Sequence, residues 1–133
     1  MSTIVDNTFG KREHLCKLTL IGELFGGNAR MVMAWPLKIV FLLIDKQDDQ
    51  DVPVQLLVSV SKRSFKRAVK RNRVKRQIRE AYRINKQQLV EKVQTMPGKQ
   101  LLMAVVWQDA KLHDSAEIEA KLQRGLQKVM DKL

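Results

Sequence analysis

Eleven lysine and arginine side chains and one glutamate lie within the segment Lys62–Arg83, and this segment most constrains how the chain can fold. Eleven cations and one anion give it a charge of +10, whereas the whole chain of 133 residues carries +11. Unpaired charges at this density cannot be buried, so the segment must present one side to solvent or to a polyanion. The rest of the chain is nearly neutral, and its apolar residues suffice for one folded domain.

A helical pattern from about Ala68 to Val93, ended by Pro97-Gly98, accommodates this charge. At 100° per residue one face collects Val74, Ile78, Ala81, Tyr82 and Leu89, and the far side collects Asn72, Lys75, Arg76, Arg79, Arg83 and Lys86. The residues from Lys62 to Lys70 precede or open the helix. We expect a loop there, because Arg67 would otherwise fall on the apolar face.

The remaining pattern predicts an α+β fold, in which a single-layer, mostly antiparallel sheet of about four strands packs with three helices in the order α-β-β-β-α-β-α. The first helix is expected over Lys11–Phe25, with Leu15, Leu18, Ile21, Leu24 and Phe25 as its apolar face and Gly26-Gly27 as its stop. Strands are expected at 31–35, 37–44, 54–60 and 101–107, with 45–51 as a hairpin loop and Asp114 or Ser115 capping the last helix. Residues 1–133 form one domain, with 1–10 as a candidate disordered tail.

Catalytic chemistry is not predicted for the protein itself. The two histidines, His14 and His113, are too few and too scattered for an acid–base pair. Asp48, Asp49 and Asp51 lie in the expected surface loop, and Cys16 has only His14 at ligand spacing, so no metal site is expected. The first residues do not resemble a secretory signal and no apolar run could span a bilayer, which favours a cytoplasmic protein.

The basic segment favours nucleic-acid binding over three other uses. A solvated helix face normally alternates Glu with Lys, whereas here cations repeat four residues apart. A zipper arm would need heptads after the basic region, and a membrane helix would need bulkier apolar residues. The candidate nucleic-acid-binding residues, which the resemblance described next assigns to RNA, are Lys62, Arg63, Arg67, Lys70, Arg71, Asn72, Arg73, Lys75, Arg76, Arg79 and Arg83.

The stretch from Val58 to Arg83 resembles the signature of the bacterial ribonuclease P protein family. The elements that match are Ser59-Val60-Ser61-Lys62, Ala68-Val69, Arg71-Asn72-Arg73, Lys75-Arg76, Arg79-Glu80 and Tyr82. Looser similarity extends to Lys11–Gly27 and to Trp35-Pro36-Leu37, so that the resemblance covers about nine tenths of the chain. Only the central part is diagnostic of the family.

This resemblance implies a left-handed crossover around the basic helix, which spacing alone would not predict. It also implies two RNA-facing surfaces. The basic helix would lie on ribonuclease P RNA, with Asn72, Lys75, Arg76 and Arg79 near the cleavage-site end. A cleft between the first helix and the sheet would hold the single-stranded 5′ leader of precursor tRNA, with Ile21, Phe25, Trp35 and Ser59 as its expected residues.

The resemblance further implies that the RNA subunit positions the magnesium ions of a holoenzyme, while the protein binds RNA and tightens the substrate. No membrane and no obligate protein partner are expected. Ile21 stands where some members have a phenylalanine, so contact there would be van der Waals rather than stacking. For Phe25 and Trp35 a role in the core is the alternative. A ribosomal-type RNA-binding module and a DNA-binding protein are the rival functions.

Overall fold

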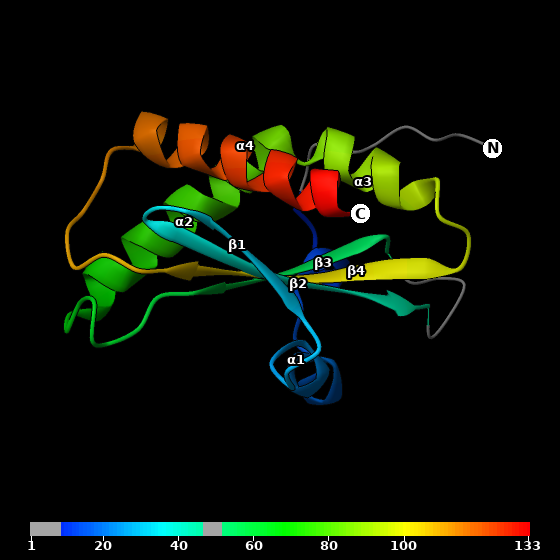
Figure 1. Ribbon diagram of the computed structural model, residues 1–133. Helices are drawn as coiled ribbons and strands as arrows, with labels where there is room; N and C mark the ends of the chain where they lie inside the picture. The colour runs from blue at the N-terminus through cyan, green and yellow to red at the C-terminus, as the bar shows by residue number, and fades with distance from the viewer. Residues whose placement is uncertain (1–8, 47–51) are drawn as a thin grey trace.

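The computed structural model describes residues 9–46 and 52–133, and its centre is a four-stranded sheet. The strands are β1 (Arg30–Ala34), β2 (Leu37–Asp45), β3 (Val54–Ser59) and β4 (Lys99–Trp107), which lie side by side in the order β1-β2-β4-β3. The helices are α1 (Leu18–Leu24), α2 (Ala68–Asn85), α3 (Gln87–Gln94) and α4 (Ser115–Lys132). Three helices cover one face of the sheet and α1 lies under the other (Figure 1), so the predicted α+β class is confirmed.

The central strand β4 pairs with β2 in antiparallel and with β3 in parallel orientation. Its alternate residues Leu101, Met103 and Val105 join the main core under α2, α3 and α4. Leu102 and Ala104 point to the other face, where they pack with α1. Burial on both faces explains why the sequence here is an almost unbroken apolar run, as predicted for a buried strand.

The predicted hairpin between the second and third strands is wrong. β3 does run back along β2, but β4 lies between them, and the loop residues 47–51 are outside the described residues. The hairpin of this sheet is β1–β2, whose turn is Trp35-Pro36. Local sequence could not reveal this arrangement, because the strand that separates β2 from β3 comes more than forty residues later in the chain.

The connection from β3 through α2 and α3 to β4 is a left-handed crossover. Figure 1 views the sheet nearly edge-on, with β1 nearest the viewer and β3 farthest, and with the helices of this connection above it. β3 and β4 both run from right to left, and the chain passes over the top from the far strand to the nearer one. This handedness is the opposite of the one that parallel strands usually adopt.

The first helix is shorter than predicted, and its buried face is different. Residues Lys11–Glu13 form a 3₁₀ turn, and His14 then makes an extended bridge to Leu56 of β3 before α1 begins. Leu20 and Leu24 are buried, whereas Leu18 is 83% exposed. The spacing from Leu15 to Leu18 resembled one helical turn, but Leu15 belongs to the extended segment, so the periodicity of α1 starts later.

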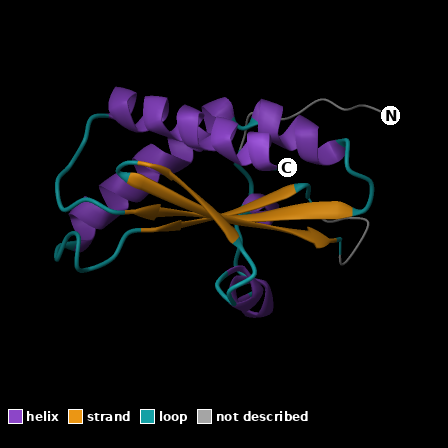
Figure 2. Ribbon diagram, viewed as in Figure 1, coloured by secondary structure: helices purple, strands orange, loops and turns teal. Residues whose placement is uncertain are grey.

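The long basic helix is interrupted at Lys86, so the described part of the chain has four α-helices in place of the three expected. The side-chain amide of Asn85 donates to the carbonyl of Ala81 at 2.8 Å, and so competes with the main-chain bonds of the last turn of α2. The chain then leaves as α3 in a different direction (Figure 2). The predicted apolar face nevertheless holds, because Val74, Ile78, Ala81, Tyr82 and Leu89 are all buried.

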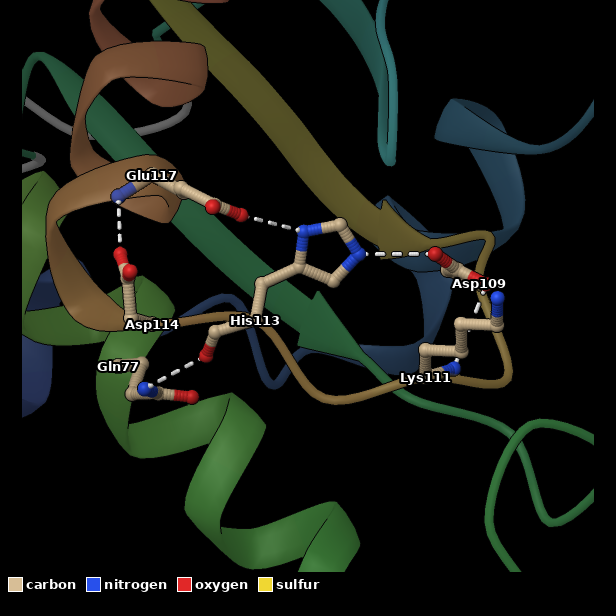
Figure 3. A network of polar contacts seen from close by, with 6 residues as sticks. All are labelled: Gln77, Asp109, Lys111, His113, Asp114 and Glu117. Atoms are coloured by element: carbon tan, nitrogen blue, oxygen red, sulfur yellow. Dashed lines mark hydrogen bonds and ion pairs between the residues drawn. The ribbon is translucent and has the colours of Figure 1, made fainter.

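The loop between β4 and α4 is organised by His113 (Figure 3). Its Nε2 lies 2.8 Å from Asp109 Oδ2 and its Nδ1 lies 3.0 Å from Glu117 Oε2. The ring also packs edge-on against Trp107, with centroids 5.2 Å apart. The hydrogen bond that the ring donates to Asp109, followed by the one to Glu117, raises the pKa of His113 above its ordinary value, although partial burial opposes the shift.

The same loop ties α4 to α2. Gln77 of α2 donates its side-chain amide to the carbonyl of His113 at 3.2 Å and to Ser115 Oγ at 3.1 Å. Asp114 caps α4, as predicted, by accepting the amide of Glu117 at 2.8 Å. The N-terminal end of α4 is therefore fixed against the middle of the basic helix. None of the helices in the described ranges has the length and apolarity needed to cross a membrane.

We predict that Leu20→Ala and Leu18→Ala will differ sharply in stability. Leu20 is 6% exposed and packs in the cluster between α1 and the sheet, so its truncation should lower the free energy of unfolding by about 2–5 kcal/mol. Truncation of the exposed Leu18 should lower the free energy of unfolding by less than about 0.5 kcal/mol. Urea unfolding measures both, and equal losses would contradict the burial pattern of α1.

We also predict that His113 makes stability depend on pH. Because its pKa is raised in the folded state, its contribution is complete below the ordinary histidine pKa of about 6.5 and is lost as pH rises through the raised value. His14 has a lowered pKa and acts in the opposite sense, but it is present in both wild type and His113→Gln. The difference in urea midpoint between these two proteins should therefore shrink from pH 6 to about pH 8. A constant difference would contradict this role.

Candidate nucleic-acid interface

The outward side of α2 forms one wall of a shallow groove of about 310 Å³. Asn72, Arg76, Arg79, Glu80 and Arg83 line it from α2, and Phe9 lines it from the N-terminal segment. Three guanidinium groups and a carboxamide thus converge on one open hollow that contains a single carboxylate. Planar guanidinium forks suit bidentate contacts with phosphate, and an aromatic ring beside them suits a nucleobase.

The N-terminal strap, residues 9–15, closes the other side of this groove. The ring of Phe9 stacks on His14 with centroids 4.0 Å apart, and it meets Tyr82 of α2 edge-on at 5.5 Å. The amide of Leu15 donates to the carbonyl of Leu56 at 2.9 Å, which attaches the strap to β3. Sequence reasoning missed Phe9 as a site residue, because no local pattern shows that the strap crosses α2.

Glu13 fixes the strap to the end of α2. One carboxylate oxygen accepts the amide of Gly10 at 2.8 Å, and the other pairs with the ammonium group of Lys86. Lys86 is 2% exposed, so its predicted place on the outward basic side is wrong. Helical spacing placed it there, but the helix breaks at this residue, and a buried cation requires a paired carboxylate.

The positive field of the groove comes from its arginines and not from His14. Burial, followed by the nearby charge of Arg79, lowers the pKa of His14, so the ring is neutral near pH 7. Burial and the negative charge of Glu13 raise the pKa of Tyr82, so its hydroxyl also stays neutral. The strap therefore contributes shape and an aromatic surface, while α2 contributes charge.

The loop predicted over Lys62–Lys70 is confirmed for residues 62–67 but is wrong for 68–70, which form the first turn of α2 directly after Arg67. Arg71 holds this loop, because its Nη1 donates to the carbonyls of Phe65 at 2.9 Å and Lys66 at 2.8 Å. The buried ring of Phe65 anchors the loop in the core. The structure therefore gives Arg71 a structural contact in addition to its predicted contact with RNA.

The eleven predicted RNA-binding side chains differ in exposure. Lys62, Arg63, Arg67, Lys70, Asn72, Arg73 and Arg76 are exposed, and Arg71, Lys75, Arg79 and Arg83 are half-buried. Arg83 pairs with Glu80 at 2.6 Å, and this contact holds the pKa of that carboxyl below its usual value. Both partners of this pair are solvent-accessible, so an incoming phosphate can replace the carboxylate. RNA contact stays a prediction for all eleven.

The four predicted leader-binding residues do not converge on one point. Ile21 and Phe25 lie one turn apart on α1, and Ile21 packs against the cluster beneath the sheet. Trp35 lies beyond the far end of β1, which spans about 17 Å for five residues. Phe25 is 52% exposed and Trp35 is 55% exposed, so neither ring belongs to the core, and that alternative is wrong for both.

A row of partly exposed side chains crosses the sheet on the face that carries α1. Ser59 of β3 is in register with Val106, Val106 with Lys38, and Lys38 with Met33 of β1. Val106 also packs at the border of the α1 cluster, so the row runs beside α1. Ser59 and Lys38 therefore lie in the same row of the sheet. Lys38 was not predicted as a site residue, because the strand register that aligns it with Ser59 cannot be read from the local sequence.

Within the described ranges, His, Cys, Asp and Glu do not form any group of three or more that could hold a metal ion. The predicted acidic loop with Asp48, Asp49 and Asp51 lies outside these ranges. The site is therefore built from guanidinium, ammonium, amide and aromatic groups. Together with the α+β fold, such a surface defines a basic nucleic-acid-binding domain.

Comparison with known proteins narrows this class. A family model described as Ribonuclease P matches residues 9–130. The ribonuclease P protein component of Porphyromonas gingivalis is 38% identical over 121 residues, which are 90% of this chain and 85% of that protein. The component from Pseudoalteromonas translucida is 36% identical over 81 residues, 61% of this chain and 54% of that protein. The chain belongs to the ribonuclease P protein family.

Solved structures agree with this fold. The Staphylococcus aureus RNase P protein, in a mutant form with defective mRNA degradation activity, aligns with a TM-score of 0.67 at 21% identity, covering 90% of this chain and 89% of that one. The RNase P protein from Thermotoga maritima aligns with a TM-score of 0.54 at 19% identity, covering 91% and 97%. At these identities the likeness supports the fold alone.

Proposed function

We propose that this protein is the protein subunit of ribonuclease P, and that it binds the catalytic RNA and precursor tRNA to assist removal of the 5′ leader. The observation that carries the proposal is the groove on α2, where Arg76, Arg79 and Arg83 stand beside Asn72 and Phe9. Within residues 9–46 and 52–133, most cations of Lys62–Arg83 form no ion pair with an acidic side chain, and a phosphate backbone would supply the missing negative charge. Family membership makes ribonuclease P RNA the expected polyanion.

The second part of the proposal concerns the leader. The exposed ring of Phe25, with Ile21 beside it, offers an apolar and aromatic surface at the end of α1. Ser59 and Lys38 continue this face across the sheet and add a hydroxyl and a cation. Single-stranded RNA is bound by this combination of stacking and positive charge.

Hydrolysis would be carried out by the RNA subunit and its magnesium ions. The described side chains of the protein contain no cluster suited to a divalent cation. In such a division of labour, metal ions held by the RNA would supply the chemistry that activates water and stabilises the leaving oxygen, while the cations of the protein would add positive charge near the substrate. The protein would thereby reduce the magnesium concentration that the RNA needs.

The decisive experiment adds the purified protein to ribonuclease P RNA at low magnesium and measures cleavage of precursor tRNA. We expect strong stimulation over the RNA alone, because the protein replaces part of the screening that magnesium provides. The stimulation should decrease as magnesium is raised. If a known subunit stimulates under the same conditions and this protein does not, the proposal fails and a ribosomal-type RNA-binding role becomes the better one.

Replacing Arg76 and Arg79 with alanine should flatten the salt dependence of RNA binding. Each phosphate contact contributes roughly 0.7–0.9 to the slope of log affinity against log salt, so losing two contacts should reduce the slope by about 1.4–1.8. Filter binding at several salt concentrations measures this change. Lys111→Gln and Lys17→Gln, which remove exposed charges away from the groove, serve as controls. An unchanged slope in the arginine variant would mean that RNA docks elsewhere.

Phe25→Ala should weaken precursor tRNA that carries a leader and leave leaderless tRNA unaffected. A lost stack on one base corresponds to a decrease in affinity of about 1–3 kcal/mol. Competition binding to the holoenzyme compares the two substrates. Since Phe25 is half-exposed, its truncation should hardly change the melting temperature. Equal losses for both substrates would indicate that the variant affects the protein's structure and not the leader.

A further inference from the structure

A second exposed apolar surface lies along the outer edge of the sheet. β1 is the edge strand, and its Met31 and Met33 are 49% and 37% exposed. Trp35, in the turn that follows, is 55% exposed. Apolar side chains that are exposed side by side often mark a binding surface. Methionine adapts to irregular partners, and an exposed indole offers a flat face for stacking.

The C-terminal half of α4 adds cations to this edge. Gly125 allows the close approach, because a Cβ at this position would lie only 2.5 Å from Ile39 Cδ1 and 3.6 Å from Ala34 Cβ. Lys128 Nζ then reaches the carbonyl of Met33 at 2.6 Å, and Arg30 Nη1 reaches the carbonyl of Lys132 at 2.6 Å. We call Arg30, Met31, Met33, Trp35, Lys128 and Lys132 the β1 edge surface.

The charges of this surface are not neutralised by nearby acids. Lys128 and Arg30 donate to main-chain carbonyls, and across the described ranges neither forms an ion pair, nor does Lys132. A hollow of about 480 Å³ lies between Met31 and Met33 on one side and Lys128 and Lys132 on the other. Asp131 also lines it and accepts the amide of Gln127 at 3.0 Å, but its one carboxylate is outnumbered by the two lysines of the lining. Charge complementarity therefore favours an anionic occupant.

A second copy of the chain is a poor occupant by comparison. Edge strands pair through free main-chain groups, but the outward carbonyl of Met33 is already capped by Lys128. Two copies would also bring together proteins that each carry +11. An occupant that combines flat apolar groups with a negative backbone fits the surface better, and unpaired RNA has both properties.

The position of the surface indicates which RNA it would meet. The row Ser59–Val106–Lys38–Met33 crosses the face that carries α1 and ends at β1, next to Trp35. The basic groove of α2 lies near β3, which is the edge strand on the other side of the sheet from β1. A strand of RNA that leaves the proposed leader surface along this row would therefore reach the β1 edge surface without meeting the groove of α2.

We propose that the β1 edge surface binds the distal part of the 5′ leader, with a base stacked on Trp35 and phosphates near Lys128 and Lys132. This inference rests on the proposed function, since it extends the path of the same leader. It assigns to Trp35 a place beyond the surface around Phe25, and it gives the exposed methionines and the cationic end of α4 a common role.

The test is a series of precursor tRNAs whose leaders lengthen by one nucleotide at a time, bound to holoenzymes that contain wild-type protein or Trp35→Leu. Wild-type affinity should rise a second time once the leader is long enough to reach the edge. Trp35→Leu should abolish that second rise, with a loss between about fivefold and a hundredfold for long leaders. Short leaders should bind both holoenzymes equally.

Two lysine variants make the comparison sharper. Lys128→Gln should weaken only the long leaders and reduce their salt slope by about 0.7. Lys111→Gln removes an exposed charge from the loop before α4 and should change neither quantity. If Trp35→Leu and Lys128→Gln bind long leaders as tightly as wild type, the inference is overturned, while stimulation of cleavage and binding of short leaders still report on the proposed function.

Tryptophan fluorescence gives an independent readout. The chain has two tryptophans, and Trp107 is 2% exposed, so quenching by RNA reports on Trp35. Long-leader precursor should quench the emission of the holoenzyme, and leaderless tRNA should not. Quenching by both substrates, or by neither, would contradict leader contact. A change in the protein's sedimentation with Trp35→Leu would also count against the inference, because it would identify the edge as a contact between copies.

Discussion

The burial of β4 on both faces is the constraint on which the rest of the molecule depends. Because its alternate side chains point to opposite faces, each face needs its own cover, and the chain supplies α2, α3 and α4 on one and α1 on the other. This division separates the two proposed RNA-facing regions. The basic groove forms beside α2 at β3, and the proposed leader surface forms beside α1 on the opposite face.

Internal ion pairs and hydrogen bonds determine which cations remain available to bind a polyanion. Lys86 is buried and forms an ion pair with Glu13, and Arg71 donates hydrogen bonds to two main-chain carbonyls of the preceding loop. Arg76 and Arg79 face the groove, with Phe9 opposite them. A protein that concentrates a net charge of +10 in one segment gains a surface for a polyanion, but it needs such internal contacts to keep the cationic helix in place.

Sequence reasoning predicted the parts of the site that depend on local periodicity. Val74, Ile78 and Tyr82 are buried and Arg76 is exposed because a helix turns by a fixed angle per residue, whatever surrounds it. It failed where neighbours decided the outcome. Leu15 lies on an extended segment bound to Leu56, so that the apolar spacing around it does not describe one continuous helix.

The sequence by itself determined that this chain would carry one cationic amphipathic helix between apolar strands, and that its use would be RNA binding within a recognisable family. Only the tertiary structure decided that β4 enters between β2 and β3, that Phe9 joins the groove, and that Trp35 stands apart from Phe25 at the edge of the sheet. The reason is physical. Periodicity is a property of each segment alone, whereas strand order and strap packing depend on contacts between residues far apart in the chain, whose burial is settled only when the whole core forms.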